Sequence, residues 1–123
     1  MAMRHGEPVF VISVAARLLE MHPQTLRKYE REGLIAPSRT TGNLRLYSDR
    51  DIERLRQVKY LVDERGLNLA GVQLALQLTH RLREARGRAR AAAKAEPNGA
   101  CETLADELDA VLAMLGVRDE GNR

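Results

Sequence analysis

The sequence predicts a mainly α-helical protein with one small β-hairpin, and three observations support this prediction. Apolar residues recur at three- and four-residue steps along most of the chain, as they do on one face of an amphipathic helix. Thr41-Gly42-Asn43 separates two short apolar runs, which is typical of a hairpin turn. Pro97-Asn98-Gly99 is the clearest break in the helical pattern, and a further amphipathic segment follows it.

A short helix is predicted from Ser13, because serine is a suitable N-cap residue. Its apolar face is formed by Val14, Ala15, Leu18 and Leu19. The preceding Phe10-Val11-Ile12 is a short apolar run that we expect to be extended and packed beneath the hairpin.

A second short helix is predicted from Pro23, whose fixed φ and missing N–H suit the first helical position. Leu26 and Tyr29 point inward at helical spacing, and Gly33 ends the helix, as glycine does where a left-handed residue is needed. The other faces of this helix carry Gln24, Thr25, Arg27, Lys28 and Arg31.

These two helices match a helix-turn-helix motif in size and spacing. They are too small to form a core alone, but the motif needs only short helices, of which the second enters the major groove of DNA. Leu34-Ile35 and Leu44-Arg45-Leu46-Tyr47 are predicted as the strands of a hairpin "wing", from which Arg39 and Arg45 reach phosphates beside the groove. The sequence therefore predicts a winged helix-turn-helix head that binds DNA.

The predicted DNA contacts come from the second helix and the wing. Gln suits adenine and Arg suits guanine or a phosphate, whereas the alternative for this helix is a solvated face. Tyr29 is placed in the core or at the DNA backbone, Asn43 at the DNA or as a turn former, and Tyr47 in the packing of the wing on the third helix. The predicted set is His22, which also suits a capping role, with Gln24, Thr25, Arg27, Lys28, Tyr29, Arg39, Thr40, Asn43, Arg45 and Tyr47.

These residues together resemble the winged-helix pattern of the MerR family. The resemblance covers roughly positions 10 to 80 and rests on Thr25-Leu26-Arg27-Lys28-Tyr29-Glu30, Gly33-Leu34-Ile35, Pro37, Arg39, Gly42, Arg45-Leu46-Tyr47 and Leu67-Asn68-Leu69-Ala70-Gly71-Val72. Within the family, Ile12-Ser13-Val14-Ala15 and the segment from Met21 to Arg27 are most similar to the heat-shock repressor branch. Arg39-Thr40 and Gly42-Asn43 are shared with the glutamine-synthetase repressors.

The resemblance implies a homodimeric repressor of chaperone and heat-shock genes that binds an inverted-repeat operator, with an Hsp70-class chaperone as co-repressor. The alternatives are a nitrogen-metabolism repressor or an activator that distorts its promoter. A more remote alternative is an excisionase-like architectural DNA-binding protein, which would lack a dimer helix after His80. A helical protein-interaction module that does not bind DNA is disfavoured by the basic residues that converge on the head.

Two further helices are predicted after the wing. Ser48 caps the first, in which Ile52, Leu55, Val58 and Val62 recur at helical spacing up to Gly66. Asn68 caps the second, which has two apolar stripes, one of Leu69, Val72 and Leu76 and the other of Leu74 and Leu78. One stripe is expected to pack on the head and the other to meet a partner.

The charges of the last third are divided into a basic and an acidic segment. Residues 81–94 carry six Lys or Arg against one acid, whereas residues 102–109 carry four acids and no base. We expect the two helices either to fold back antiparallel within the chain or to pair across a dimer. The predicted dimer or partner interface is Leu78, Leu82, Ala85, Ala89, Leu104, Leu108, Val111 and Leu115.

The predicted organisation is a flexible arm over 1–9, the DNA-binding head over 10–80, a dimerisation helix over 81–96, and a turn with a short C-terminal amphipathic helix over 97–123. Only about 40 residues follow the head, too few to enclose a sizeable effector pocket. Any signal is therefore expected to act through a protein partner, the dimer helix or the tail.

Composition excludes several other classes of protein. The single cysteine, Cys101, excludes an internal disulfide and fits a reducing bacterial cytoplasm, with the nucleoid as the expected location. The histidines and this cysteine are too few and dispersed for a metal site, no cofactor is expected, and no catalytic constellation indicates an enzyme. We expect no membrane span and no secretory signal. An aromatic content of 3% disfavours a stacking platform for RNA or single strands.

Overall fold

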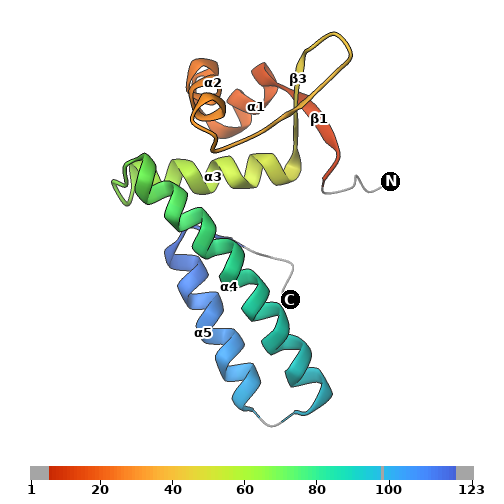
Figure 1. Ribbon diagram of the computed structural model, residues 1–123, viewed down its shortest axis with the longest axis vertical. Helices are drawn as coiled ribbons and strands as arrows, with labels where there is room; N and C mark the ends of the chain where they lie inside the picture. Colours follow the sequence, from red (N-terminus) through yellow and green to blue (C-terminus); the bar gives the residue numbers. More distant parts are fainter. Residues whose placement is uncertain (1–5, 98, 119–123) are drawn as a thin grey trace. The chain divides into compact units, whose positions relative to one another are not determined.

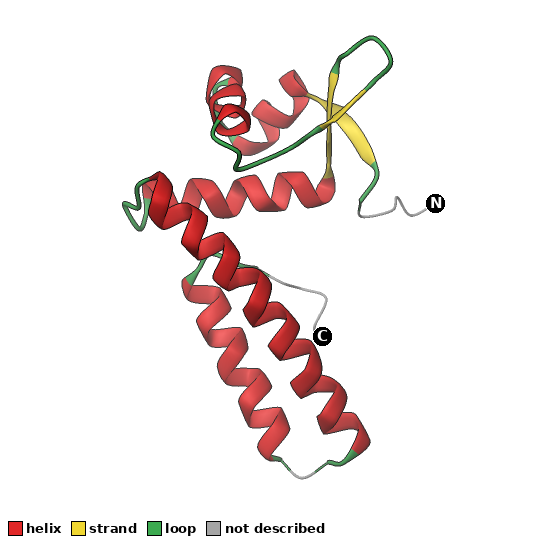
Figure 2. Cartoon of the chain, in the orientation of Figure 1, coloured by secondary structure: helices red, strands yellow, loops and turns green. Residues whose placement is uncertain are grey.

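The computed structural model describes residues 6–97 and 99–118, which form two compact units divided within one helix between Tyr60 and Leu61. The first unit contains β1 (Pro8–Val11), α1 (Ile12–Leu19), α2 (Pro23–Arg31), β2 (Ser38–Arg39), β3 (Arg45–Ser48) and most of α3 (Asp49–Asp63) (Figure 1). The second contains α4 (Leu69–Ala95) and α5 (Ala100–Met114). The predicted mainly α-helical fold with a helix-turn-helix and a small wing is confirmed (Figure 2). Predictions that fall on residues 1–5, 98 and 119–123 lie outside the described residues.

The small sheet has three antiparallel strands in the order β1-β3-β2, rather than the two predicted. The extended run at Phe10 and Val11 pairs with Tyr47 and Leu46, so it forms an edge strand of the sheet itself. Pro8 and Val9 belong to the same strand, so the expected flexible arm does not extend to residue 9.

The first wing strand was also predicted at the wrong place. It is β2, at Ser38–Arg39, and not Leu34-Ile35. The end of α2 explains the difference. Gly33 has φ of 79°, and the N–H groups of Gly33 and Leu34 donate to the carbonyls of Glu30 and Tyr29, which is a Schellman motif. The chain therefore turns back at Leu34, and Leu34 and Ile35 pack into the core instead of pairing as a strand.

Helix α1 begins one residue before the predicted cap. Val11 is held in the sheet opposite Leu46, so the chain enters the helix directly at Ile12, and Ser13 lies exposed in the first turn. This start also changes the buried face. Ala15, Ala16 and Leu19 are buried, whereas Leu18, predicted to be inward, is 43% exposed.

A turn of three residues joins α1 to α2, and α3 stabilises it. Glu20 takes a left-handed conformation with φ of 54°. The Lys59 ammonium on α3 donates to the carbonyls of Leu19 and Glu20 at 2.9 and 3.3 Å, which satisfies groups that the end of a helix leaves unpaired. The helix-turn-helix is thus fixed on the helix beneath it.

Helix α3 has the predicted cap and the predicted core face. The Ser48 N–H donates to the Asp51 carboxylate and the Asp51 N–H donates to the Ser48 hydroxyl, both at 3.0 Å, which is a reciprocal capping box. Ile52, Leu55 and Val58 are buried, in line with the predicted spacing, whereas Val62 is half-buried.

In the second unit, α4 and α5 lie side by side as an antiparallel hairpin (Figure 1). The cap at Asn68 is confirmed, because its side chain accepts a hydrogen bond from the Gly71 N–H at 2.9 Å. Helix α4 continues unbroken through residue 80, where the predicted boundary between head and dimerisation helix lay. None of the helices in the described ranges combines the length and apolar character that crossing a membrane requires.

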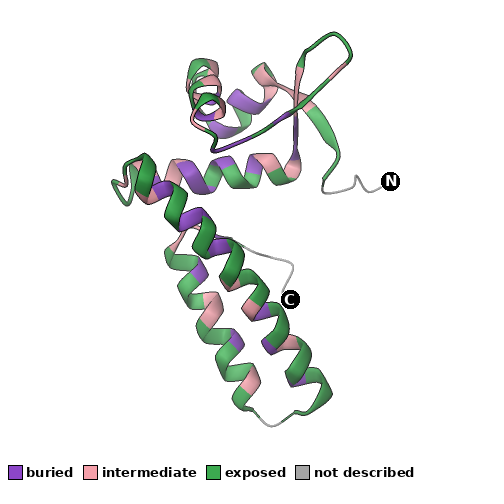
Figure 3. Ribbon diagram, viewed as in Figure 1, coloured by how far each residue is buried: buried purple, intermediate pink, exposed green. Residues whose placement is uncertain are grey.

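The fold-back of α5 onto α4 within one chain is the arrangement observed, but the contact uses a different stripe of α5. Ala105 and Leu112 are buried, whereas Leu104 and Val111 are 51% and 40% exposed. The reason is the rotation of α5 about its axis. Asp109 pairs with Arg86 and Arg90 at 3.1 and 2.5 Å, while Leu104 and Val111 of the predicted interface lie on another side of the helix. Buried and exposed positions alternate along α5 (Figure 3).

Candidate nucleic-acid interface

One side of α2 is polar and accessible, and the other closes the core of the first unit. Leu26 and Tyr29 are buried, at 0% and 9% exposure. Gln24 and Lys28 are exposed on the opposite side, and Arg27 is half-buried between them. This division is what a recognition helix needs, because one face must be held rigidly while the other meets a groove.

His22 forms the N-cap of this helix. Its Nδ1 accepts a hydrogen bond from the Gln24 N–H at 3.0 Å, and Pro23 occupies the first helical position as predicted. The capping alternative for His22 is therefore the one that the geometry supports. Since the cap fixes the first turn, it also fixes the directions in which the Gln24 and Thr25 side chains project from the helix.

The wing turn is shaped by two residues of the predicted DNA-contacting set. The Thr40 hydroxyl accepts from the Leu44 N–H at 3.1 Å, and the Thr40 carbonyl accepts from the Asn43 N–H at 2.9 Å. Asn43 has φ of 67°, a left-handed conformation that asparagine tolerates better than most residues. Both residues have a structural task here, and both remain exposed or half-buried at the wing tip.

Tyr29 and Tyr47 are buried in the first unit. The Tyr47 side chain is fully buried, and its hydroxyl has no hydrogen-bond partner within the described part of the chain. Burial raises the pKa of this phenol, and the charges of Arg45, Glu30, Arg27 and Arg39 act on it as well. Both tyrosines belong to the core, which supports the core alternative for Tyr29 and the expected packing of Tyr47, although both were also included in the predicted contact set.

A carboxylate that the sequence analysis did not single out joins the wing to the recognition helix. Glu30 of α2 binds Arg39 through Oε2 at 2.8 Å and Arg45 through Oε1 at 2.6 Å. Arg39 and Arg45 are directly opposite each other on β2 and β3. The Arg39 guanidinium also donates to the Asn43 carbonyl at 3.2 Å.

The charge state of Glu30 follows from these contacts. Its burial alone would raise the pKa, but the hydrogen bonds and positive charges of Arg45 and Arg39 together hold the pKa below its ordinary value. Glu30 is therefore ionised at neutral pH, and one carboxylate binds two arginines. Sequence spacing gave no signal for this cluster, since Arg39 and Arg45 lie 9 and 15 residues after Glu30 in the chain.

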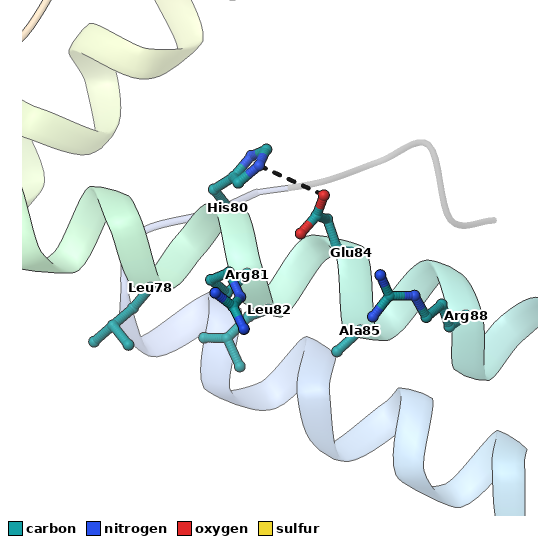
Figure 4. Close-up of a pocket in the computed structure, with 7 residues that line it drawn as sticks. All are labelled: Leu78, His80, Arg81, Leu82, Glu84, Ala85 and Arg88. Atoms are coloured by element: carbon teal, nitrogen blue, oxygen red, sulfur yellow. Dashed lines mark ion pairs between the residues drawn. The ribbon is translucent and has the colours of Figure 1, made fainter.

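The predicted dimer or partner residues all lie on the α4–α5 hairpin. Leu78, Leu104 and Val111 are exposed, Leu82, Ala85, Leu108 and Leu115 are half-buried, and Ala89 is buried. A groove of about 620 Å³ follows α4 and is lined by Leu78, His80, Arg81, Leu82, Glu84, Ala85 and Arg88 (Figure 4). Among the described residues, no group of three His, Cys, Asp or Glu side chains is placed to hold a metal ion.

Comparison with known protein families finds a match over the part of the chain that holds this site. The MerR HTH family regulatory protein model matches residues 10–79, which include the whole helix-turn-helix, the wing and α3. The chain belongs to the MerR family. The resemblance recognised in the sequence is thus confirmed.

Curated relatives of the chain include proteins named as transcriptional regulators. The putative heat shock protein HspR of Streptomyces coelicolor is 54% identical over 82 residues, which are 67% of this chain and 54% of that protein. The HTH-type transcriptional regulator GlnR of Bacillus anthracis is 37% identical over 82 residues, or 67% of this chain and 63% of that protein. MlrA of Escherichia coli is 38% identical over 69 residues, 55% of this chain and 28% of that protein. The chain thus matches only about half to three-fifths of the length of its first two relatives.

Proposed function

We propose that this MerR-family chain is a sequence-specific DNA-binding regulator that represses heat-shock genes as a homodimer on an inverted-repeat operator. The observation that supports the heat-shock branch best is the 54% identity to a protein named for heat shock, against 37% to the GlnR regulator over the same length. An Hsp70-class chaperone as co-repressor is part of the proposal, and its support is the resemblance to that branch alone.

In this proposal the polar side of α2 enters the major groove. The Gln24 and Thr25 side chains project from the capped first turn, which is where recognition helices carry their base contacts. Arg27 and Lys28 follow about one turn later, and the wing arginines Arg39 and Arg45 supply further phosphate contacts. Cation contacts with phosphates supply affinity, and the first turn supplies sequence preference.

The proposed dimer interface is one edge of the α4–α5 hairpin. The ion pairs of Arg86 and Arg90 with Asp106 and Asp109 lie along one edge. At the helical step of roughly 100° per residue, Val111 points about 160° away from Asp109, and Leu78 about 120° away from Arg90. Away from these ion pairs, α4 and α5 carry large apolar side chains that are 40% to 59% exposed, namely Leu74, Leu78, Leu104, Val111 and Met114.

An exposed apolar face of this extent favours a protein partner, because single monomers seldom leave such a surface uncovered. A second copy of the chain is the occupant we propose, since an inverted-repeat operator needs two heads related by a two-fold axis.

The test is selection of duplexes from a random DNA library with the full chain, followed by binding to promoter fragments of the source genome. We expect the selected sequences to contain an inverted repeat, and chaperone-gene promoters to bind more tightly than glutamine-synthetase promoters. A preference for glutamine-synthetase promoters would support the nitrogen-regulator alternative. Selected single half-sites bound by monomers would support the architectural alternative.

A further inference from the structure

The ion pairs of Glu30 lie at the junction of the two DNA-contacting elements. Helix α2 carries the carboxylate, and the two strands of the wing carry the arginines, one bound to each oxygen. The Glu30 side chain is 23% exposed, and those of Arg39 and Arg45 are 34% and 26% exposed. The cluster is therefore partly shielded but still reachable from the surface on which DNA is proposed to bind.

This geometry restricts where the wing cations lie. Two arginines directly opposite each other on neighbouring strands repel, and their long side chains have many rotamers. A shared carboxylate removes both problems, because each oxygen accepts a hydrogen bond from one guanidinium. Arg39 is further fixed by the Asn43 carbonyl at 3.2 Å, and Arg45 binds Glu30 through Nε, so its terminal nitrogens take no part in that bond.

The same carboxylate has an electrostatic effect on DNA binding. It places one negative charge among the cations nearest the phosphates, so it lowers the sequence-independent attraction of the head for any duplex. Affinity that is lost equally for all sequences leaves specificity unchanged. Fixed arginine positions, by contrast, favour only the DNA on which the base contacts of α2 are made at the same time.

We infer that Glu30 is a specificity-determining residue of the head: it positions Arg39 and Arg45 relative to the recognition helix and suppresses binding to unselected DNA. The inference rests on the proposed DNA-binding function. It assigns Glu30 a positioning role and no direct contact with DNA.

The experiment compares two variants that separate charge from position. Glu30→Gln removes the charge, while Glu30→Asp keeps the charge but is one methylene too short to hold both arginines. Glu32→Gln is the matched control, because it removes the same charge beyond the end of the same helix. Each full-length protein is titrated by fluorescence anisotropy with a duplex selected by the wild-type chain and with a shuffled duplex of equal length, across a series of salt concentrations.

For Glu30→Gln we expect the ratio of selected to shuffled affinity to fall about tenfold, because Arg39 and Arg45 are no longer held in position relative to α2. Binding to the shuffled duplex should strengthen several-fold, and its log–log salt slope should steepen by about 0.9. Glu30→Asp should lose the same ratio while binding the shuffled duplex within about twofold of wild type. Glu32→Gln should keep the wild-type ratio.

Two results overturn the inference. In the first, both Glu30 variants keep the wild-type ratio. In the second, both lose affinity for the two duplexes equally and their thermal unfolding temperature drops, which would make Glu30 a purely structural residue. A wild-type chain that enriches no sequence from the library refutes the proposed regulator itself, and that outcome is distinct because it is seen before any variant is made.

Discussion

Arg45 contributes to both the stability of the head and the proposed phosphate contacts. Its ion pair with Glu30 is partly buried, so Arg45→Ala leaves the carboxylate with a single partner. We expect a loss of about 1 kcal/mol in the free energy of unfolding, which is near the upper end of the contribution of partly exposed ion pairs to stability. Urea denaturation followed by circular dichroism measures it.

Arg27 provides the contrasting substitution. It lies on α2 without a role in the Glu30 pair, so Arg27→Ala should change the free energy of unfolding by less than about 0.5 kcal/mol. DNA affinity should nevertheless fall and the salt slope should flatten by about one unit, because one phosphate contact is lost. If this variant keeps the wild-type DNA affinity and salt slope, α2 is not the recognition helix.

The depressed pKa of Glu30 makes part of the stability dependent on pH. A carboxyl whose folded-state pKa is lowered stabilises the fold above the unfolded-state pKa, near 4.5, and this contribution is lost as the pH falls through the folded-state value. Wild type should therefore be more stable than Glu30→Gln at pH 7, and the difference should shrink below about pH 4.5. Paired denaturation curves from pH 7 to 3 measure the difference, and a gap that stays constant with pH would contradict the assigned ion pair.

At the scale of elements, the caps decide where helices start and how they are joined. Gly71 has no Cβ, and one built there would lie 3.2 Å from the Leu67 Cβ and 3.3 Å from the Asn68 carboxamide oxygen. The glycine thus gives room for the Asn68 cap, whose acceptor closes the first turn of α4. The pair works as one start signal for a 27-residue helix.

Removing this cap gives a prediction at the same scale. Asn68→Ala should lower the free energy of unfolding by about 1 kcal/mol, since the Gly71 N–H loses its acceptor. Asn68→Asp is the matched control and should retain wild-type stability, because aspartate accepts the same bond. Equal losses in both variants would mean that packing of the residue, and not its capping bond, sets the stability.

At the scale of the whole molecule, the exposed apolar edge of the hairpin is the feature that predicts assembly. Leu78→Asp combined with Val111→Asp should convert the proposed dimer into a monomer by light scattering, because two charges would be buried without partners. Leu18→Asp is the control, because Leu18 is exposed to a similar degree, 43% against 45% for Leu78, but belongs to α1. A double variant that stays dimeric would place the interface elsewhere on the chain.

The sequence by itself determined the elements that local chemistry controls. Pro23, Ser48 and Asn68 mark helix starts, and Gly33 marks a helix end, because each acts on backbone groups within a few residues. The family pattern is equally local, so the winged helix-turn-helix was predictable. The inward side of α2 followed from helical spacing alone.

Contacts between residues far apart in the chain could not be predicted from the sequence. The tertiary structure paired β1 with β3, buried Leu34, turned Leu104 and Val111 outward, and joined Glu30 to Arg39 and Arg45, which lie 9 and 15 residues further along the chain. Strand pairing and side-chain ion pairs are set by packing and by rotation of whole helices, for which sequence periodicity gives a face but not a partner. That is why the helices were foreseen and the carboxylate between the wing arginines was not.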